Sequence, residues 1–173
     1  MRKESKGEII IAPRYAKVIG PVIFLAGPIQ GAADWQSRAI QLIQNKNPEL
    51  NIASPRRAVF FGKSFTEADW NEQVDWEHYY LQRASENGVI LFWLAKEAEH
   101  RCDRAYAQIT RFELGEAVVL QKLAKIKVVV GVEEDFTGGR YVRKTLRKKY
   151  PDIPLCDTLE ATCETAVQLA IKK

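Results

Sequence analysis

The sequence of 173 residues lacks the long apolar run, roughly 20 residues, that a membrane-spanning helix requires. Its first residues, MRKESKGEII, are too polar for a secretory signal peptide. The three cysteines, Cys102, Cys156 and Cys163, form no C-x-x-C pair, so we expect no disulfide framework. These absences predict a cytoplasmic protein with reduced thiols and no membrane partner.

Several common catalytic and cofactor-binding motifs are also missing. No G-x-S-x-G nucleophile elbow is present, and the loop LAGPIQG at 25–31 is neither a dinucleotide-binding G-x-G-x-x-G nor a P-loop. The only histidines are His78 and His100, and the polar segment EHRCD at 99–103 lacks the spacing of zinc ligands. We therefore expect no metal ion and no organic cofactor.

Basic residues are concentrated in one short segment, although the net charge is only +4. The segment RYVRKTLRKKY at 140–150 holds six Lys or Arg residues, which could form a patch for phosphate or nucleic acid. It also has the pattern of an amphipathic helix with Val142 and Leu146 on its apolar side and the charges in solvent. No zinc finger, RNA-recognition signature or helix-turn-helix accompanies it, so we favour the solvated helix and do not expect a nucleic-acid partner.

What the sequence does contain is an alternation of short apolar runs with helix-like segments. The runs typical of buried strands lie at 21–27, 50–55, 88–94, 125–132 and 152–157. Helical patterns lie at 34–45, at about 69–85, from about 110, and at 158–173. Continuous apolar strands separated by helices are typical of a parallel sheet covered on both faces.

We therefore predict a single domain over 1–173, with residues 1–19 as an N-terminal arm. Its fold class is α/β: a flavodoxin-like or Rossmann-like doubly wound sheet of about five mainly parallel strands with helices on both faces. In such folds a ligand binds beyond the carboxyl ends of the strands, near a switch in strand order. The pocket is expected there.

A glutamate interrupts the apolar side of the predicted helix at 69–85. At 100° per residue, Trp70, Val74, Leu81 and Ala84 form one stripe, and Glu77 lies within it. Glu77 could be an acid of the predicted pocket or could belong to a structural ion pair with an arginine.

Two aromatic residues of the same helix, Trp76 and Tyr79, face away from this stripe. They could form an outer surface on which another subunit docks, and we expect a homo-oligomer. Alternatively, they could pack under the N-terminal arm at 8–19.

The segment RFELGEAVVL at 111–120 places Glu113 and Glu116 in the first turns of another apolar helix. The helix dipole favours acids at that end to a small extent. Gly115 within the helix costs up to about 1 kcal/mol relative to alanine, which suggests close approach of another backbone or a ligand. Carboxylates that converge on the pocket suit chemistry at an acetal or N-glycosidic carbon, with one as nucleophile and another group handling the proton.

Four segments in order resemble the nucleoside 2-deoxyribosyltransferase-like proteins, and most closely their bacterial and phage branch. They are FLAGPIQGAADWQ (24–36), SPRR (54–57), EQVDWEHYYLQRASENGVILFW (72–93) and ITRFELGEA (109–117). The resemblance covers about residues 20–145. It implies that the ligand is a nucleoside or nucleotide. Members of the family commonly complete their pocket from a neighbouring subunit, which also implies a homo-oligomer.

The resemblance also implies roles for individual residues. Glu113, in the E-L-G segment, would be the nucleophile that attacks the anomeric carbon, and Glu116 would be its neighbour. Glu77, in the W-E pair, would position the base or sugar as the second catalytic residue. The substrate-binding residues implied by the matching segments are Gly27, Pro28, Gln30, Trp35, Pro55, Trp93 and Thr110.

One departure concerns the proton donor. Transferases of this kind carry an aspartate about six residues before the nucleophile, whereas this chain has Ala107, and Asp103 is the nearest acid. The expected function is cleavage or transfer at the N-glycosidic bond of a (deoxy)nucleoside or nucleotide, through a glycosyl-enzyme intermediate. Two alternatives stay open: hydrolysis of a nucleoside 5′-monophosphate, and a non-catalytic nucleotide-binding or sensing module on the same fold.

Overall fold

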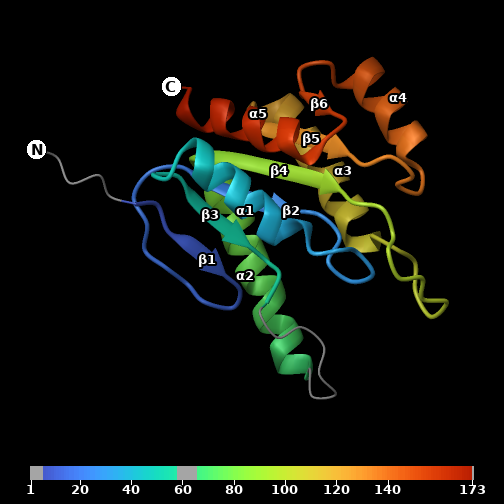
Figure 1. Ribbon diagram of the computed structural model, residues 1–173, viewed down its shortest axis with the longest axis horizontal. Helices are drawn as coiled ribbons and strands as arrows, with labels where there is room; N and C mark the ends of the chain where they lie inside the picture. The colour runs from blue at the N-terminus through green and yellow to red at the C-terminus, as the bar shows by residue number, and fades with distance from the viewer. Residues whose placement is uncertain (1–5, 58–65, 173) are drawn as a thin grey trace, which may run out of the picture.

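The computed structural model describes residues 6–57 and 66–172 and contains a parallel sheet flanked by helices (Figure 1). Within those residues the sheet has six strands in the order β1-β3-β2-β4-β5-β6. Their bounds are β1 Ile9–Ile11, β2 Val22–Ala26, β3 Asn51–Ser54, β4 Gly88–Leu94, β5 Val128–Val132 and β6 Leu155–Cys156. The predicted doubly wound α/β fold is confirmed.

The first strand is an addition to the prediction, because β1 lies in the segment expected to be an arm. It pairs with β3 in parallel, with Ile9 opposite Ile52 and Ile11 opposite Ser54. A run of three isoleucines is too short to show a strand period, so the sequence pattern alone did not distinguish it from an arm.

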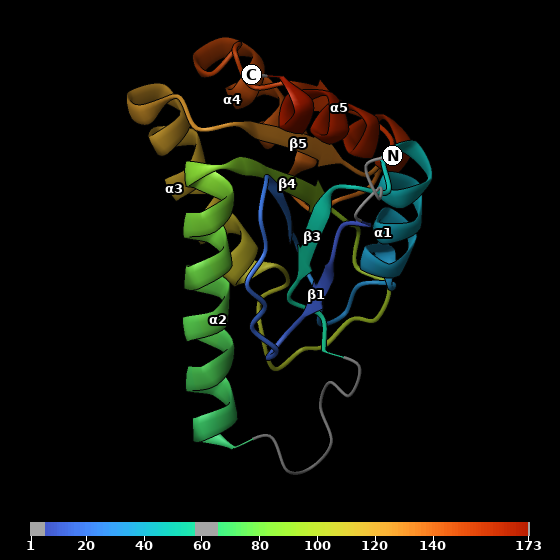
Figure 2. The same cartoon turned by 90° about the vertical axis from the view of Figure 1, so that its left-hand side faces the viewer.

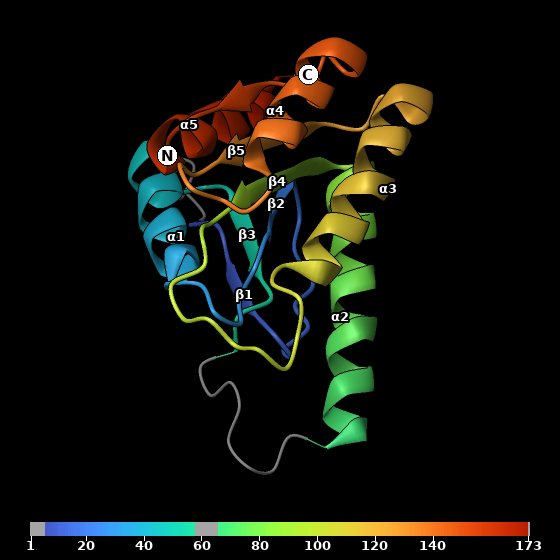
Figure 3. The same cartoon turned by 90° about the vertical axis from the view of Figure 1, so that its right-hand side faces the viewer.

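The helices are α1 Trp35–Lys46, α2 Glu67–Glu86, α3 Gln108–Ala124, α4 Gly139–Lys149 and α5 Leu159–Ile171. One side of the sheet is covered by α1 and α5, and the other by α2 and α3 (Figure 2, Figure 3). Alternate residues of each strand point to opposite faces, so Phe24 and Phe92 face α2 and α3, whereas Leu25 and Trp93 face α1 and α5. No helix in the described parts of the chain combines the length and apolar character needed to cross a membrane.

The chain changes direction within the sheet at β2 and β4. From β2 it crosses through α1 to β3 on one side, and from β4 it crosses through α3 to β5 on the other. The loops that follow β2 and β4 therefore diverge, and a crevice forms beyond the carboxyl ends of these two strands.

The buried face of α2 differs from the predicted stripe. The structure buries Gln73, Trp76, Tyr80 and Ala84, whereas the side chain of Trp70 is 51% exposed. The N-terminal segment covers this face: Trp76 Nε1 donates to the Arg14 carbonyl oxygen at 2.7 Å, and Ala16 N donates to the Tyr80 hydroxyl at 2.8 Å.

The predicted outer aromatic surface is therefore wrong for Trp76, which packs under the arm as in the alternative reading. Tyr79 is still 46% exposed and contacts Tyr15 edge to face. Helical periodicity could not separate the two faces, because one of them meets the N-terminal segment and the other meets the crevice.

Candidate active site

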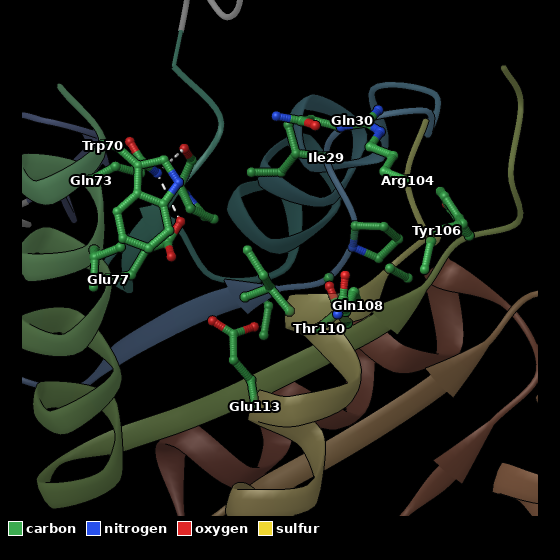
Figure 4. A pocket seen from close by; sticks show the side chains of 18 of the residues that line it. Ile29, Gln30, Trp70, Gln73, Glu77, Arg104, Tyr106, Gln108, Thr110 and Glu113 are labelled. Carbon is green, nitrogen blue, oxygen red and sulfur yellow. Dashed lines mark hydrogen bonds between the residues drawn. The ribbon is translucent and has the colours of Figure 1, made fainter. Parts of the chain in front are cut away.

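The pocket lies beyond β2, β3 and β4, between α2 and the beginning of α3 (Figure 4). This is the place expected from the doubly wound fold. Its lining comes from four segments of the chain, at 24–30, 55, 70–77 and 104–113. The lining residues are Phe24, Ala26, Gly27, Pro28, Ile29, Gln30, Pro55, Trp70, Gln73, Val74, Glu77, Arg104, Ala105, Tyr106, Ala107, Gln108, Ile109, Thr110 and Glu113.

The loop after β2 is held by close packing that only glycine permits at its first position. A Cβ atom on Gly27 would lie 2.3 Å from the Trp93 carbonyl oxygen and 2.7 Å from the Trp35 ring. Trp35 Nε1 donates to the Pro28 carbonyl oxygen at 2.9 Å. Arg56, after β3, donates to Gln36 Oε1 at 2.8 Å and to three carbonyl oxygens of this loop. The loop after β2 is thus held in place by Trp35 and by Arg56.

Glu113 extends from the second turn of α3 into the pocket (Figure 4). Among the described residues it has no hydrogen-bond or ion-pair partner. Burial raises the pKa of Glu113 to about 8, with smaller contributions from the charges of Glu77 and Glu116. Much of this carboxyl population therefore carries a proton at neutral pH in the free protein.

Glu77 lies across the pocket on α2, and a chain of polar groups orients it. Gln73 Nε2 donates to Glu77 Oε1 at 2.8 Å and to the Pro55 carbonyl oxygen at 2.9 Å. Arg57 Nε donates to Gln73 Oε1 at 2.6 Å, which fixes the amide so that its NH₂ group faces Glu77. Burial raises the pKa of Glu77, although the hydrogen bond from Gln73 acts in the opposite direction.

Two further lining groups lie on opposite sides of the pocket, with Glu113 between them in Figure 4. Trp70 is half exposed and contributes a flat aromatic surface on the side of α2. Arg104, in the loop between β4 and α3, lies beside Gln30 on the other side (Figure 4). The pocket thus combines an aromatic surface, two carboxyl groups and a cation.

The structure places most of the residues selected from the sequence in this pocket. Glu77, Glu113, Gly27, Pro28, Gln30, Pro55 and Thr110 all line it.

Two selected residues, Trp35 and Trp93, are outside the lining and pack in the core on the α1 and α5 side of the sheet. Trp35 supports the loop through its bond to Pro28, and Trp93 packs against Gly131. Direct contact of either tryptophan with a substrate stays a prediction.

The other acids considered from the sequence lie away from the cavity. Glu116 is exposed on α3, and Asp103 is exposed and paired with Arg101 at 2.9 Å. Ala107 lines the pocket where an aspartate occurs in the transferases that the chain resembles. Gly115 faces open space, with no described atom within 4 Å of a Cβ built there, so the expected close approach is absent within the described residues.

Sequence reasoning missed several polar or aromatic residues of the lining, among them Trp70, Gln73, Arg104 and Tyr106. Trp70 was assigned to the core stripe, and Gln73 carries no signal in a pattern of apolar residues. Arg104 and Tyr106 lie in the loop at 95–107, where no period exists to show which side chains point inward. One indication in the sequence that they line the pocket is that they follow the carboxyl end of β4. No cluster of three or more possible metal ligands occurs in residues 6–57 and 66–172.

Fold and site together define an α/β protein with paired carboxyl groups in a pocket at the switch point of its sheet. A family model described as nucleoside 2-deoxyribosyltransferase like matches residues 20–136. This match spans more than half of the chain, so the protein belongs to the nucleoside 2-deoxyribosyltransferase-like family, as the sequence predicted. A search of curated proteins finds no match. Family membership supports nucleoside-related glycosyl transfer and a nucleoside or nucleotide ligand.

Proposed function

We propose that this protein cleaves the N-glycosidic bond of a nucleoside or nucleotide, with Glu113 as the nucleophile. The observation that carries the proposal is an unpaired carboxyl group that projects into the pocket opposite a second carboxyl group. A carboxylate nucleophile and a nearby acid are the two groups that a retaining glycoside cleavage requires.

The reaction would proceed in two steps. A carboxylate oxygen of Glu113 bonds to the anomeric carbon while the bond from that carbon to the base nitrogen breaks. The electron pair of the broken bond stays with the base, which receives a proton from the carboxyl group of Glu77. Water or the nitrogen of a second base then attacks the anomeric carbon, releases Glu113 and returns a proton to Glu77.

The raised pKa values bear on how the two acids divide these tasks. The reaction needs charge on Glu113 and a proton on Glu77, while the pKa of Glu113 is about 8 in the free protein. Positive charge that develops at the anomeric carbon favours the ionised form of Glu113. Glu77 is the only other carboxyl group in the described lining, and its own raised pKa favours the protonated form that a donor needs.

The aromatic surface of Trp70 suits the base of the substrate. Nucleobases stack on exposed aromatic rings, and removal of such a ring costs about 1–3 kcal/mol per base. Trp70 and Glu77 are both on α2. A base on Trp70 would therefore place its leaving nitrogen on the same side of the pocket as the proposed donor.

The decisive test compares Glu113→Gln with Glu116→Gln, because both glutamates are on α3 and only the first lines the pocket. Each variant is incubated with a panel of deoxynucleosides, ribonucleosides and their 5′-monophosphates, with and without an acceptor base, and free base is measured by chromatography. We expect Glu113→Gln to abolish base release and Glu116→Gln to retain it. Undiminished turnover in Glu113→Gln would overturn the assignment.

A non-catalytic nucleotide-binding module is the second candidate, and Ala107 is the observation that favours it. The same panel distinguishes the two functions. Binding in a calorimeter without base release by the wild-type protein would support the binding module. Release of base in the absence of an acceptor would instead support a hydrolase.

We further propose that the protein is a homo-oligomer that associates through α3. Phe112 and Leu123 are each 76% exposed on this helix. Gly115 leaves the helix backbone open to close approach. In light scattering we expect Phe112→Asp to reduce the molar mass, and Tyr141→Asp, at an exposed aromatic residue of α4, to leave it unchanged. A monomeric wild-type protein at micromolar concentration would contradict the proposal.

A further inference from the structure

Arg104 is a cation of the pocket lining, and its charge acts on the exposed carboxylate of Asp103 only at a distance, without a hydrogen bond. It is half-buried, and no hydrogen bond or ion pair joins it to another described residue. The nearest acid in sequence, Asp103, is paired with Arg101. By contrast, Arg56 is held by Gln36, Asp34 and backbone carbonyl groups, so its charge has a structural use.

The charges of the pocket are separated. Its carboxyl groups, Glu77 and Glu113, lie on α2 and α3, whereas Arg104 lies beyond them, next to Gln30 (Figure 4). An anionic group close to the carboxylates would be repelled, while the same group beside Arg104 would be attracted. The pocket therefore favours a ligand whose glycosidic carbon lies near the two carboxyl groups and whose negative charge lies near Arg104.

The beginning of α3 adds to this positive region. Its N-cap residue, Ala107, has no side-chain capping bond, and the first helical residues, Gln108 and Thr110, line the pocket. Uncapped N–H groups and the helix dipole favour an anion at this end of a helix. The planar guanidinium of arginine also matches the oxygen geometry of a phosphate, to which it can donate two parallel hydrogen bonds.

We propose that Arg104 binds the 5′-phosphate of the substrate, so that the protein acts on nucleoside 5′-monophosphates in preference to free nucleosides. This inference rests on the proposed function, because the phosphate is expected beside Arg104 when the anomeric carbon lies at Glu113. Arg104 is then the residue that determines specificity, and it takes no part in bond cleavage. Gln30 supplies a neutral donor next to it.

The test compares Arg104→Gln with Arg101→Gln, a change in the same loop at an arginine outside the pocket lining. For one base, kcat/KM is measured with the deoxynucleoside and with its 5′-monophosphate. We expect the wild-type protein and Arg101→Gln to prefer the monophosphate. In Arg104→Gln, kcat/KM for the monophosphate should fall about 10- to 100-fold, the loss expected for a charged hydrogen bond, with little change for the nucleoside. Arg104→Lys should recover part of the preference.

The inference fails if the wild-type protein uses both substrates equally, or if Arg104→Gln lowers kcat/KM for both by the same factor. Calorimetry with Glu113→Gln separates this failure from failure of the proposed function. Suppose that the wild-type protein releases no base. Phosphate recognition still stands if Glu113→Gln binds the monophosphate more tightly than the nucleoside and if adding Arg104→Gln to this variant removes the difference. Equal affinity for the two ligands, or no binding of either, would overturn phosphate recognition by Arg104.

Discussion

The two faces of the sheet serve different purposes. Against one face, α1 and α5 pack through small buried side chains such as Ala39 and Ala166. On the other face, α2 and α3 have the pocket between them, and each contributes a glutamate to it. Stable packing and the pocket are thus divided between two sides of the same strands, and both carboxyl groups of the pocket, which are costly to bury, lie on the open side.

After loss of the proposed nucleophile Glu113, the largest effect expected on the open face is that of Glu77→Gln on catalysis. Loss of a general acid typically lowers the rate by about 10²- to 10⁴-fold, so kcat should fall in this range while the protein stays folded. Because the charge of Glu77 contributes to the raised pKa of Glu113, the pKa of Glu113 in the free variant should also fall below the wild-type value of about 8. Steady-state kinetics measures the first effect, and an NMR titration of the Glu113 carboxyl group measures the second. An unchanged kcat would remove Glu77 from the mechanism.

On the closed face, Gly131→Ala should be the most damaging of the stability changes. Its Cβ atom would lie 2.1 Å from Thr162 Oγ1 and 2.5 Å from the Trp93 ring, where the sheet meets α5. Overpacking of this kind costs about 1–3 kcal/mol or more. Urea denaturation should show a lower midpoint. A midpoint equal to that of the wild-type protein would contradict the close packing of Gly131 against Thr162 and Trp93.

Removal of the charge at Glu113 should stabilise the protein, in contrast to its effect on activity. The pKa of Glu113 is raised in the folded state to about 8 from 4.5, so the folded protein binds more protons than the unfolded chain between these pH values. Wild-type stability therefore falls as pH rises through this window. Glu113→Gln should be more stable than the wild-type protein by roughly 1–3 kcal/mol above pH 8, with a smaller difference near pH 5.

Denaturation of the same pair of proteins at pH 5 and pH 8.5 measures this difference. Glu116→Gln, at an exposed position, is the control and should change the stability little at either pH. An advantage of Glu113→Gln that is the same at both pH values would contradict the raised pKa.

The smallest effect is expected for Gly115→Ala on the open face. Because nothing in the described structure lies within 4 Å of the added Cβ atom, the free energy of unfolding should increase by up to about 1 kcal/mol through helix propensity alone. This substitution is the counterpart of Gly131→Ala. Weaker self-association in light scattering would point to a partner helix against Gly115, whereas destabilisation of the monomer would contradict the open surface.

The extent to which the sequence predicted this protein differs between its parts. The strands β2, β4 and β5 were recognised because each is a continuous apolar run, which a strand buried on both sides requires. Glu113 was selected in two steps, because acids in an apolar helix are exceptional and the family resemblance then distinguished Glu113 from Glu116. β1 was missed, and the buried side of α2 was assigned to the wrong residues, because both depend on the N-terminal segment that pairs with β3 and covers Trp76.

The sequence by itself determined the alternation of strands and helices, the family, and the selection of Glu113 and Glu77 as candidate catalytic residues, since these depend on local patterns and on residue types. Only the tertiary structure decided that Trp35 supports the loop after β2, that the Trp93 ring packs against Gly131, and that Trp70 and Arg104 line the pocket. It also showed that Gln73 connects Arg57 to Glu77. The reason is physical, because the direction and the partners of a side chain depend on residues distant in sequence. A loop has no periodic pattern from which its inward-facing side chains could be predicted.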